Sequence, residues 1–66
     1  MRLLVNGKPT ETIDSASVQT LVEQLGLSPT GIAVAVNRAV VPLSARRQRL
    51  LKPTDQVEII QAVGGG

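Results

Sequence analysis

Cysteine, histidine and all three aromatic residue types are absent from this chain of 66 residues. Without cysteine, the chain has no disulfide, no thiolate nucleophile and no thiolate metal ligand. Without histidine, it lacks the usual proton shuttle and the commonest metal ligand. Its five acidic residues are scattered over expected turns and polar faces. We therefore expect no catalytic residue and no metal site in this chain.

Long apolar runs and a strong net charge are also absent. No run approaches the roughly eighteen residues of a membrane-spanning helix. The N-terminal apolar stretch ends at Asn6-Gly7, too early for a signal peptide. The net charge of +2 is low for a nucleic-acid module, and the aromatic stacking platforms of single-strand binders are missing. We expect a cytoplasmic protein that binds neither a membrane nor a nucleic acid.

The N-terminal half of the chain has the pattern of a hairpin followed by a helix. Asn6-Gly7 favours a tight hairpin turn between strands at 2–5 and 8–13. Pro9 cannot donate a ladder hydrogen bond, which puts the second strand at a sheet edge. Ser17 is the expected N-cap of a helix that ends at Gly26. The apolar stripe of this helix consists of Val18, Leu21, Val22 and Leu25.

The C-terminal half supplies further strands. We expect strands at 32–36 and 57–62, with a short extended piece at 40–41 that Pro42 ends. The stretch 43–51 is ambiguous and is interpreted as a helical turn followed by irregular chain. One helix on one sheet is the simplest arrangement of these elements. The prediction is therefore an α+β domain, with a mixed sheet of four to five strands and one main helix packed on one face.

One helix covers only one face of a sheet. Strand alternation then leaves several apolar side chains on the opposite face, namely Leu4, Ala33, Ala35, Ile60 and Ala62. Exposed apolar residues are common, so this face is either ordinary surface or a docking patch for another protein. Leu4, Ile60 and Ala62 are the candidate docking residues.

Four basic residues gather within seven positions, at Arg46, Arg47, Arg49 and Lys52. The simplest interpretation is a solvated basic loop. If the cluster has a function, we expect Arg46 and Arg47 to meet an acidic rim on a partner enzyme.

The chain ends in Gly64-Gly65-Gly66, which cannot add to a core. We expect residues 1–63 to form the domain and residues 64–66 to form a flexible tail. Such a tail can thread a narrow channel and present its terminal carboxylate in the active site of another protein. The alternative is a frayed terminus or a remnant of cloning.

The ordered set of these features resembles the ThiS family of sulfur carrier proteins, which have the ubiquitin-like β-grasp fold. The set comprises the Asn6-Gly7 hairpin, the capped helix, the strand before Asn37, Val41-Pro42, Asp55-Gln56-Val57 and the terminal Gly65-Gly66. The chain departs from the family pattern at Gly64, where alanine is commoner, and at Pro53-Thr54, which replaces a turn such as Asp-Gly.

The resemblance implies definite chemistry at the tail. A ThiF-type adenylyltransferase would use ATP and magnesium to adenylate the carboxylate of Gly66, so the chain itself would bind no cofactor. A sulfur relay protein of the cysteine desulfurase type would then supply the sulfur of a thiocarboxylate. The thiazole synthase ThiG would accept this sulfur for the thiazole ring of thiamine. In this interpretation the chain is a protein co-substrate and not an enzyme.

Three alternatives remain open at this point. The small subunit of molybdopterin synthase shares the fold and the thiocarboxylate, although it is usually longer and richer in aromatic residues. A ubiquitin-like protein modifier also needs a terminal Gly-Gly. A β-grasp interaction module that is not conjugated would need the apolar face but not the tail.

Overall fold

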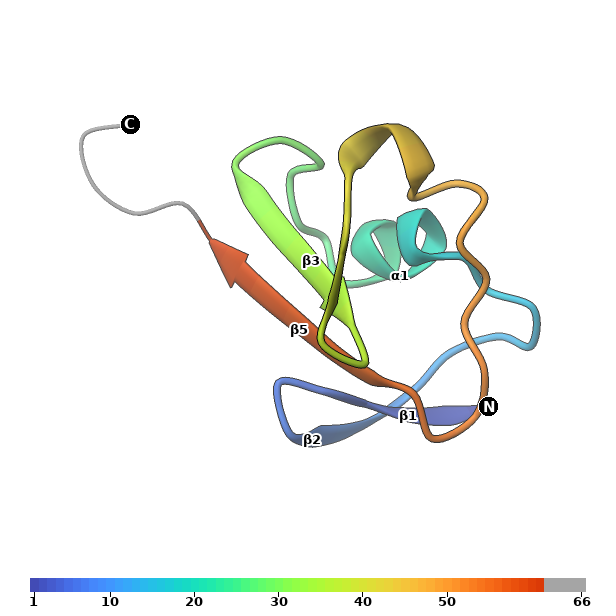
Figure 1. Cartoon of the computed structure of the whole chain (residues 1–66). Coiled ribbons are helices and arrows are strands. Elements are labelled where there is room, and N and C mark those ends of the chain that lie inside the picture. The colour runs from blue at the N-terminus through green and yellow to red at the C-terminus, as the bar shows by residue number, and fades with distance from the viewer. Residues whose placement is uncertain (62–66) are drawn as a thin grey trace.

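The computed structural model describes residues 1–61, and Figure 1 shows one sheet with a single α-helix on one side. Ala62, the predicted domain boundary at residue 63 and the tail 64–66 lie outside the described residues. In chain order the elements are β1 (Arg2–Val5), β2 (Lys8–Glu11), α1 (Val18–Gln24), β3 (Ile32–Val36), β4 (Ala39–Val41), the 3-10 helix η1 (Leu43–Ala45) and β5 (Gln56–Gln61).

The five strands form a mixed sheet in the order β2-β1-β5-β3-β4. β5 runs parallel to β1 and antiparallel to β3. β2 pairs antiparallel with β1, and β4 pairs antiparallel with β3. The last strand of the chain therefore lies at the centre of the sheet, beside the first (Figure 1). Pro9 lies on the edge strand β2, as predicted. The strand predicted at 8–13 ends earlier, at Glu11.

The helix forms as its sequence pattern predicts. The Ser17 hydroxyl accepts a hydrogen bond from the Thr20 N–H at 3.1 Å, which caps the first turn. At the other end Gly26 has a φ of 72°, the left-handed conformation that glycine adopts without a steric penalty. The helix buries Val18, Leu21 and Val22 on one face of the sheet, where the core also contains Leu3, Val5, Val34, Val36, Val57 and Ile59. Leu25, the fourth residue of the predicted stripe, follows the helix as its C-cap and is 36% exposed, so that part of the prediction is wrong. The predicted alternation of the strands is thus confirmed.

The stretch 43–51 is a helical turn followed by irregular chain, and it carries one buried cation. Arg46 is only 3% exposed. Its guanidinium donates to the carbonyl oxygens of Pro29 at 2.7 Å and of Ile32 at 2.9 Å. Arg46 is therefore neither a solvated residue of a basic loop nor a surface residue that can meet an acidic rim, and both interpretations are wrong for this residue. The side chain is drawn inward because these two carbonyls need a donor, while its neighbour Arg47 is exposed.

Candidate functional site

The candidate site begins at the end of β5, the last strand before the C-terminal tail. β5 ends at Gln61, which lies in register with Ile32 at the start of β3. The predicted reactive residue Gly66 and its neighbours Gly64 and Gly65 follow beyond the described residues. The structure thus gives the position of the last strand before the tail, in the middle of the sheet (Figure 1).

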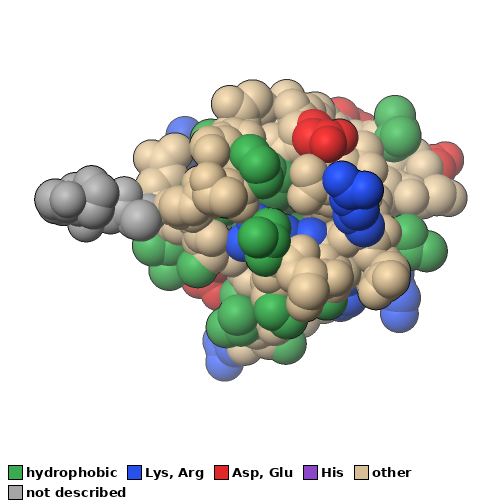
Figure 2. Space-filling model, turned by 90° about the horizontal axis from the view of Figure 1, so that it is seen from above, with side chains coloured by type: hydrophobic (Ala, Val, Ile, Leu, Met, Phe, Trp, Pro, Cys, Tyr) green, Lys and Arg blue, Asp and Glu red, His purple; other side chains and the backbone are tan. Residues whose placement is uncertain are grey.

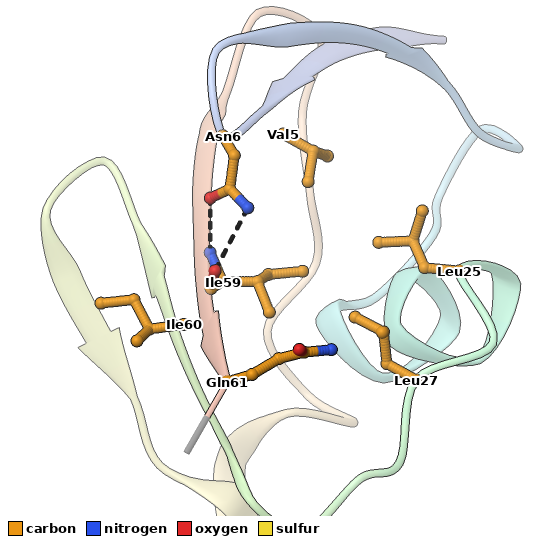
Figure 3. A pocket seen from close by; sticks show the side chains of 7 residues that line it. All are labelled: Val5, Asn6, Leu25, Leu27, Ile59, Ile60 and Gln61. Carbon is orange, nitrogen blue, oxygen red and sulfur yellow. Dashed lines mark hydrogen bonds between the residues drawn. The ribbon is translucent and has the colours of Figure 1, made fainter. Parts of the chain in front are cut away.

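Asn6 holds this last strand from the side of β1. The side-chain amide of Asn6 donates to the Ile59 carbonyl at 3.1 Å, and its oxygen accepts from the Ile59 N–H at 2.9 Å (Figure 3). The backbone N–H of Asn6 also donates to the Val57 carbonyl at 2.8 Å. The sequence predicted Asn6 as a turn residue only. Its second role depends on a partner 53 residues away, which no local pattern reveals.

A hollow of about 620 Å³ lies beside the end of β5. Leu25 and Leu27 border it from the end of the helix and the following loop, while Val5 and Ile59 border it from the sheet (Figure 3). Among the described residues, its lining has no acidic or basic side chain. An apolar hollow with two amide side chains can hold part of a partner but offers no general acid, general base or nucleophile.

The opposite face of the sheet carries a mainly apolar patch that we name the outer patch, made of Ala33, Ala35, Val40 and Ile60, which the acidic residue Glu58 also lines. Ala33 lies opposite Ile60, and Ala35 lies opposite Val40. Ile60 is 68% exposed and Val40 is 74% exposed. The large apolar side chains of Val40 and Ile60 are thus exposed to solvent on the same patch of the sheet.

Leu4 lies on the same face of the sheet as Ile60 but not in the outer patch. It is half-buried and pairs with Pro9 on one side and Gln56 on the other. It borders a separate hollow of about 380 Å³ with Arg2, Pro9 and Thr54. Leu4 and Ile60 therefore lie on one face of the sheet but border separate hollows.

The basic cluster predicted at 46–52 lies only partly on the surface. Arg46 is buried, Arg49 turns its guanidinium onto the Leu50 carbonyl, and Arg47 and Lys52 are exposed. Figure 2 shows one face on which lysine and arginine side chains are scattered between apolar and acidic ones. Such a distribution does not favour a phosphate-binding surface on this face.

Residues 1–61 contain neither a cluster of metal ligands nor a helix that could span a membrane. No three acidic side chains there come together as a metal site. No helix in that part of the chain has the length and apolar character needed to cross a membrane.

A mixed sheet with one helix on one face and a central last strand that leads to the C-terminus defines a ubiquitin-like β-grasp protein. The family model described as the ThiS family matches residues 3–66. The sulfur carrier protein ThiS of Escherichia coli is 30% identical over 66 residues, which cover 100% of both chains. The crystal structure of the thiamine biosynthesis protein ThiS from Geobacter metallireducens superposes with a TM-score of 0.85 at 32% identity, again over 100% of both chains. The chain therefore belongs to the ThiS family, and its β-grasp fold is confirmed.

Two longer relatives carry a different name. A thiazole synthase of Paramagnetospirillum magneticum is 33% identical over 66 residues, and one of Magnetococcus marinus is 32% identical over the same length. In each case the whole chain is matched, but it spans only 20% of the relative. These relatives thus contain a ThiS-like stretch within a much longer chain.

Proposed function

We propose that this chain carries sulfur for thiamine biosynthesis, as a thiocarboxylate on Gly66. The main support is the match to a sulfur carrier protein over the full length of both chains, with the family match extending to Gly66. The lack of a cysteine fits this proposal, because the sulfur would ride on the carboxyl carbon of the backbone and not on a side chain.

The proposed chemistry begins with the carboxylate of Gly66. In a ThiF-type adenylyltransferase it would attack the α-phosphate of ATP, with magnesium bound by that enzyme, and release pyrophosphate. A persulfide on a relay protein of the cysteine desulfurase type would then attack the acyl carbon, and AMP leaves as its bond to that carbon breaks. A thiol would cleave the sulfur–sulfur bond of the resulting acyl disulfide, which leaves the thiocarboxylate on Gly66 and a disulfide on the relay protein. No side chain of this protein takes part in bond making, so the chain is a co-substrate of these cytoplasmic enzymes.

The thiazole synthase is the proposed acceptor of the sulfur. Two relatives with that name include a stretch that matches this entire chain, which supports association between the two kinds of domain. The outer patch supplies a mainly apolar surface of the kind that binds another protein, with Ile60 one residue before the last described residue of β5. We propose Ile60 as a docking residue of the outer patch, and Leu4, Arg47 and Ala62 as further docking residues.

The intact mass of the protein tests this function. The chain is incubated with its adenylyltransferase, ATP, magnesium, a cysteine desulfurase and cysteine. Its mass should rise by the difference between a sulfur and an oxygen atom, and a variant without Gly66 should not change. An unchanged mass with enzymes that are active on another carrier would contradict the proposal. The thiocarboxylate form is then offered to a thiazole synthase and to the large subunit of molybdopterin synthase, and loss of the sulfur only to the latter would assign the other pathway.

A further inference from the structure

At the end of the sheet from which the tail leaves, β3 and β5 pair with each other but have no further strand on their outer sides. β1 pairs with β5 no further than Val57, because the chain turns at Asn6-Gly7. β4 pairs with β3 no closer to the tail than Val34, because Pro42 follows β4. β3 and β5 nevertheless run on together as far as Gln61. A two-stranded ribbon on its own has little stability in water, so its last residues need other support.

On one side, the side chain of Asn6 supplies that support. The Val57 carbonyl accepts from the Asn6 backbone, which means that alternate residues of β5, including Ile59, direct their backbone groups towards β1. At Ile59 there is no strand residue left to pair with. The Asn6 amide binds both the N–H and the carbonyl of Ile59, as a further residue of a strand would (Figure 3).

On the other side, the side chain of Arg46 has the same role. The Ile32 carbonyl has no partner on β4, and the Arg46 guanidinium donates to it at 2.9 Å. Ile32 is the register partner of Gln61, the last described residue before the tail. A second donor of the guanidinium binds the Pro29 carbonyl at 2.7 Å. The buried cation has no acidic partner among the described residues, which is a costly arrangement for a side chain that only fills space.

We propose that Asn6 and Arg46 are positioning residues for the reaction at the C-terminus, an inference that rests on the function proposed above. Their side chains replace the missing strands on the two sides of the β3–β5 ribbon and fix Gln61, from which the tail leaves. Five residues separate Gln61 from Gly66, so the carboxylate stays within at most about 18 Å of this anchor. A reacting group displaced by about 1 Å can lose about a hundredfold in rate, so the position of the anchor affects catalysis in the partner.

Asn37 offers a matched control for Asn6. Both residues have a positive φ, 52° for Asn6 and 51° for Asn37, and both hold the backbone of β5 through their side chains. Asn37 binds Gln56, at the end of β5 remote from the tail. Glycine tolerates a positive φ, so N6G and N37G each remove a side chain while they preserve the turn.

The test measures adenylation by ATP–pyrophosphate exchange with the ThiF-type adenylyltransferase, at saturating ATP and varied carrier concentration. For N6G we expect kcat to fall by about tenfold while KM changes by less than about twofold. For N37G we expect kcat to match that of the unchanged protein. Amide hydrogen exchange gives a second readout, in which N6G should accelerate exchange at Ile59 and N37G should not.

Arg46 is tested with R46K, which keeps the charge but cannot reach two carbonyls with a planar fork. We expect the same loss of kcat. R38K is the control and should keep the kcat of the unchanged protein, because Arg38 is an exposed arginine in the turn between β3 and β4. Equal kcat values for N6G and N37G at equal folded fraction would overturn the inference and leave the proposed function intact. Absence of exchange with the unchanged protein would instead overturn the proposed function and the inference with it.

Discussion

Arg46 provides the sharpest test of how this fold is held together. Its guanidinium makes two hydrogen bonds to backbone carbonyls, those of Pro29 and Ile32, in a side chain that is 3% exposed. R46A removes both donors at once. Each buried carbonyl left without a donor costs about 1–3 kcal/mol. Pro29 is exposed, so water can reach its carbonyl, and the cost comes mainly from the Ile32 carbonyl; we expect R46A to lower the free energy of unfolding by about 1–3 kcal/mol.

That loss is large for so small a chain. At typical values per residue, a protein of 66 residues has a free energy of unfolding of about 3–10 kcal/mol. R46A therefore removes a substantial part of the stability, and R46K, which retains the charge and one donor group, should lie between R46A and the unchanged protein. R47A is the matched control, because Arg47 is the adjacent exposed arginine, and surface substitutions of this kind change stability by no more than about 0.5 kcal/mol.

Urea denaturation followed by far-UV circular dichroism is the appropriate assay, because the chain has no tryptophan or tyrosine to report unfolding by fluorescence. The midpoint should fall for R46A with an unchanged slope. Equal midpoints for R46A and R47A would refute the reasoning, since they would mean that both guanidinium groups are in water. A more stable R46A would mean that the cost of burying the cation exceeds the benefit of its two hydrogen bonds.

Two further predictions concern the surface and the tail. I60D should weaken binding to the adenylyltransferase or the thiazole synthase by at least about tenfold, as for a central interface residue, without changing the urea midpoint. I13D is its control, because Ile13 is 66% exposed against 68% for Ile60 but lies outside the outer patch; equal binding of the two variants in calorimetric titrations would argue against docking at the patch. Deletion of Gly66 should abolish the mass increase and leave the urea midpoint unchanged; a shifted midpoint would mean that the tail contributes to the folded domain.

The sequence was sufficient to predict which side chains face the helix. Leu3, Val5, Val34 and Val36 alternate with outward-facing residues, and this period of two survives in the sheet because one face is buried. The turns were equally accessible, since Asn6-Gly7 and Gly26 stand at positions that require a positive φ. These features depend on residues that are close in sequence, and local patterns record such interactions well.

The features that sequence patterns missed depend on residues far apart in the chain. The Asn6 amide meets Ile59 across 53 residues, and Arg46 meets Ile32 across 14. A charged residue among other charged residues is normally solvated, so nothing local distinguished Arg46 from Arg47. The role of the tail was predicted from the family resemblance and not from a local pattern. A terminal glycine run by itself does not distinguish a carrier from a frayed end.

The composition and the support of β5 fit one chemical requirement. In the proposed function the terminal carboxyl group is adenylated, and an acyl adenylate is an electrophile for which a thiol on the same protein would compete. The chain has no cysteine, so no such reaction can occur within it. The strand that precedes the tail is likewise held by unreactive groups. The neutral amides of Asn37 and Asn6 bind the backbone of Gln56 and Ile59. An amide supplies both a donor and an acceptor to the backbone of β5 and is itself unreactive, whereas an amine in those positions would add a nucleophile.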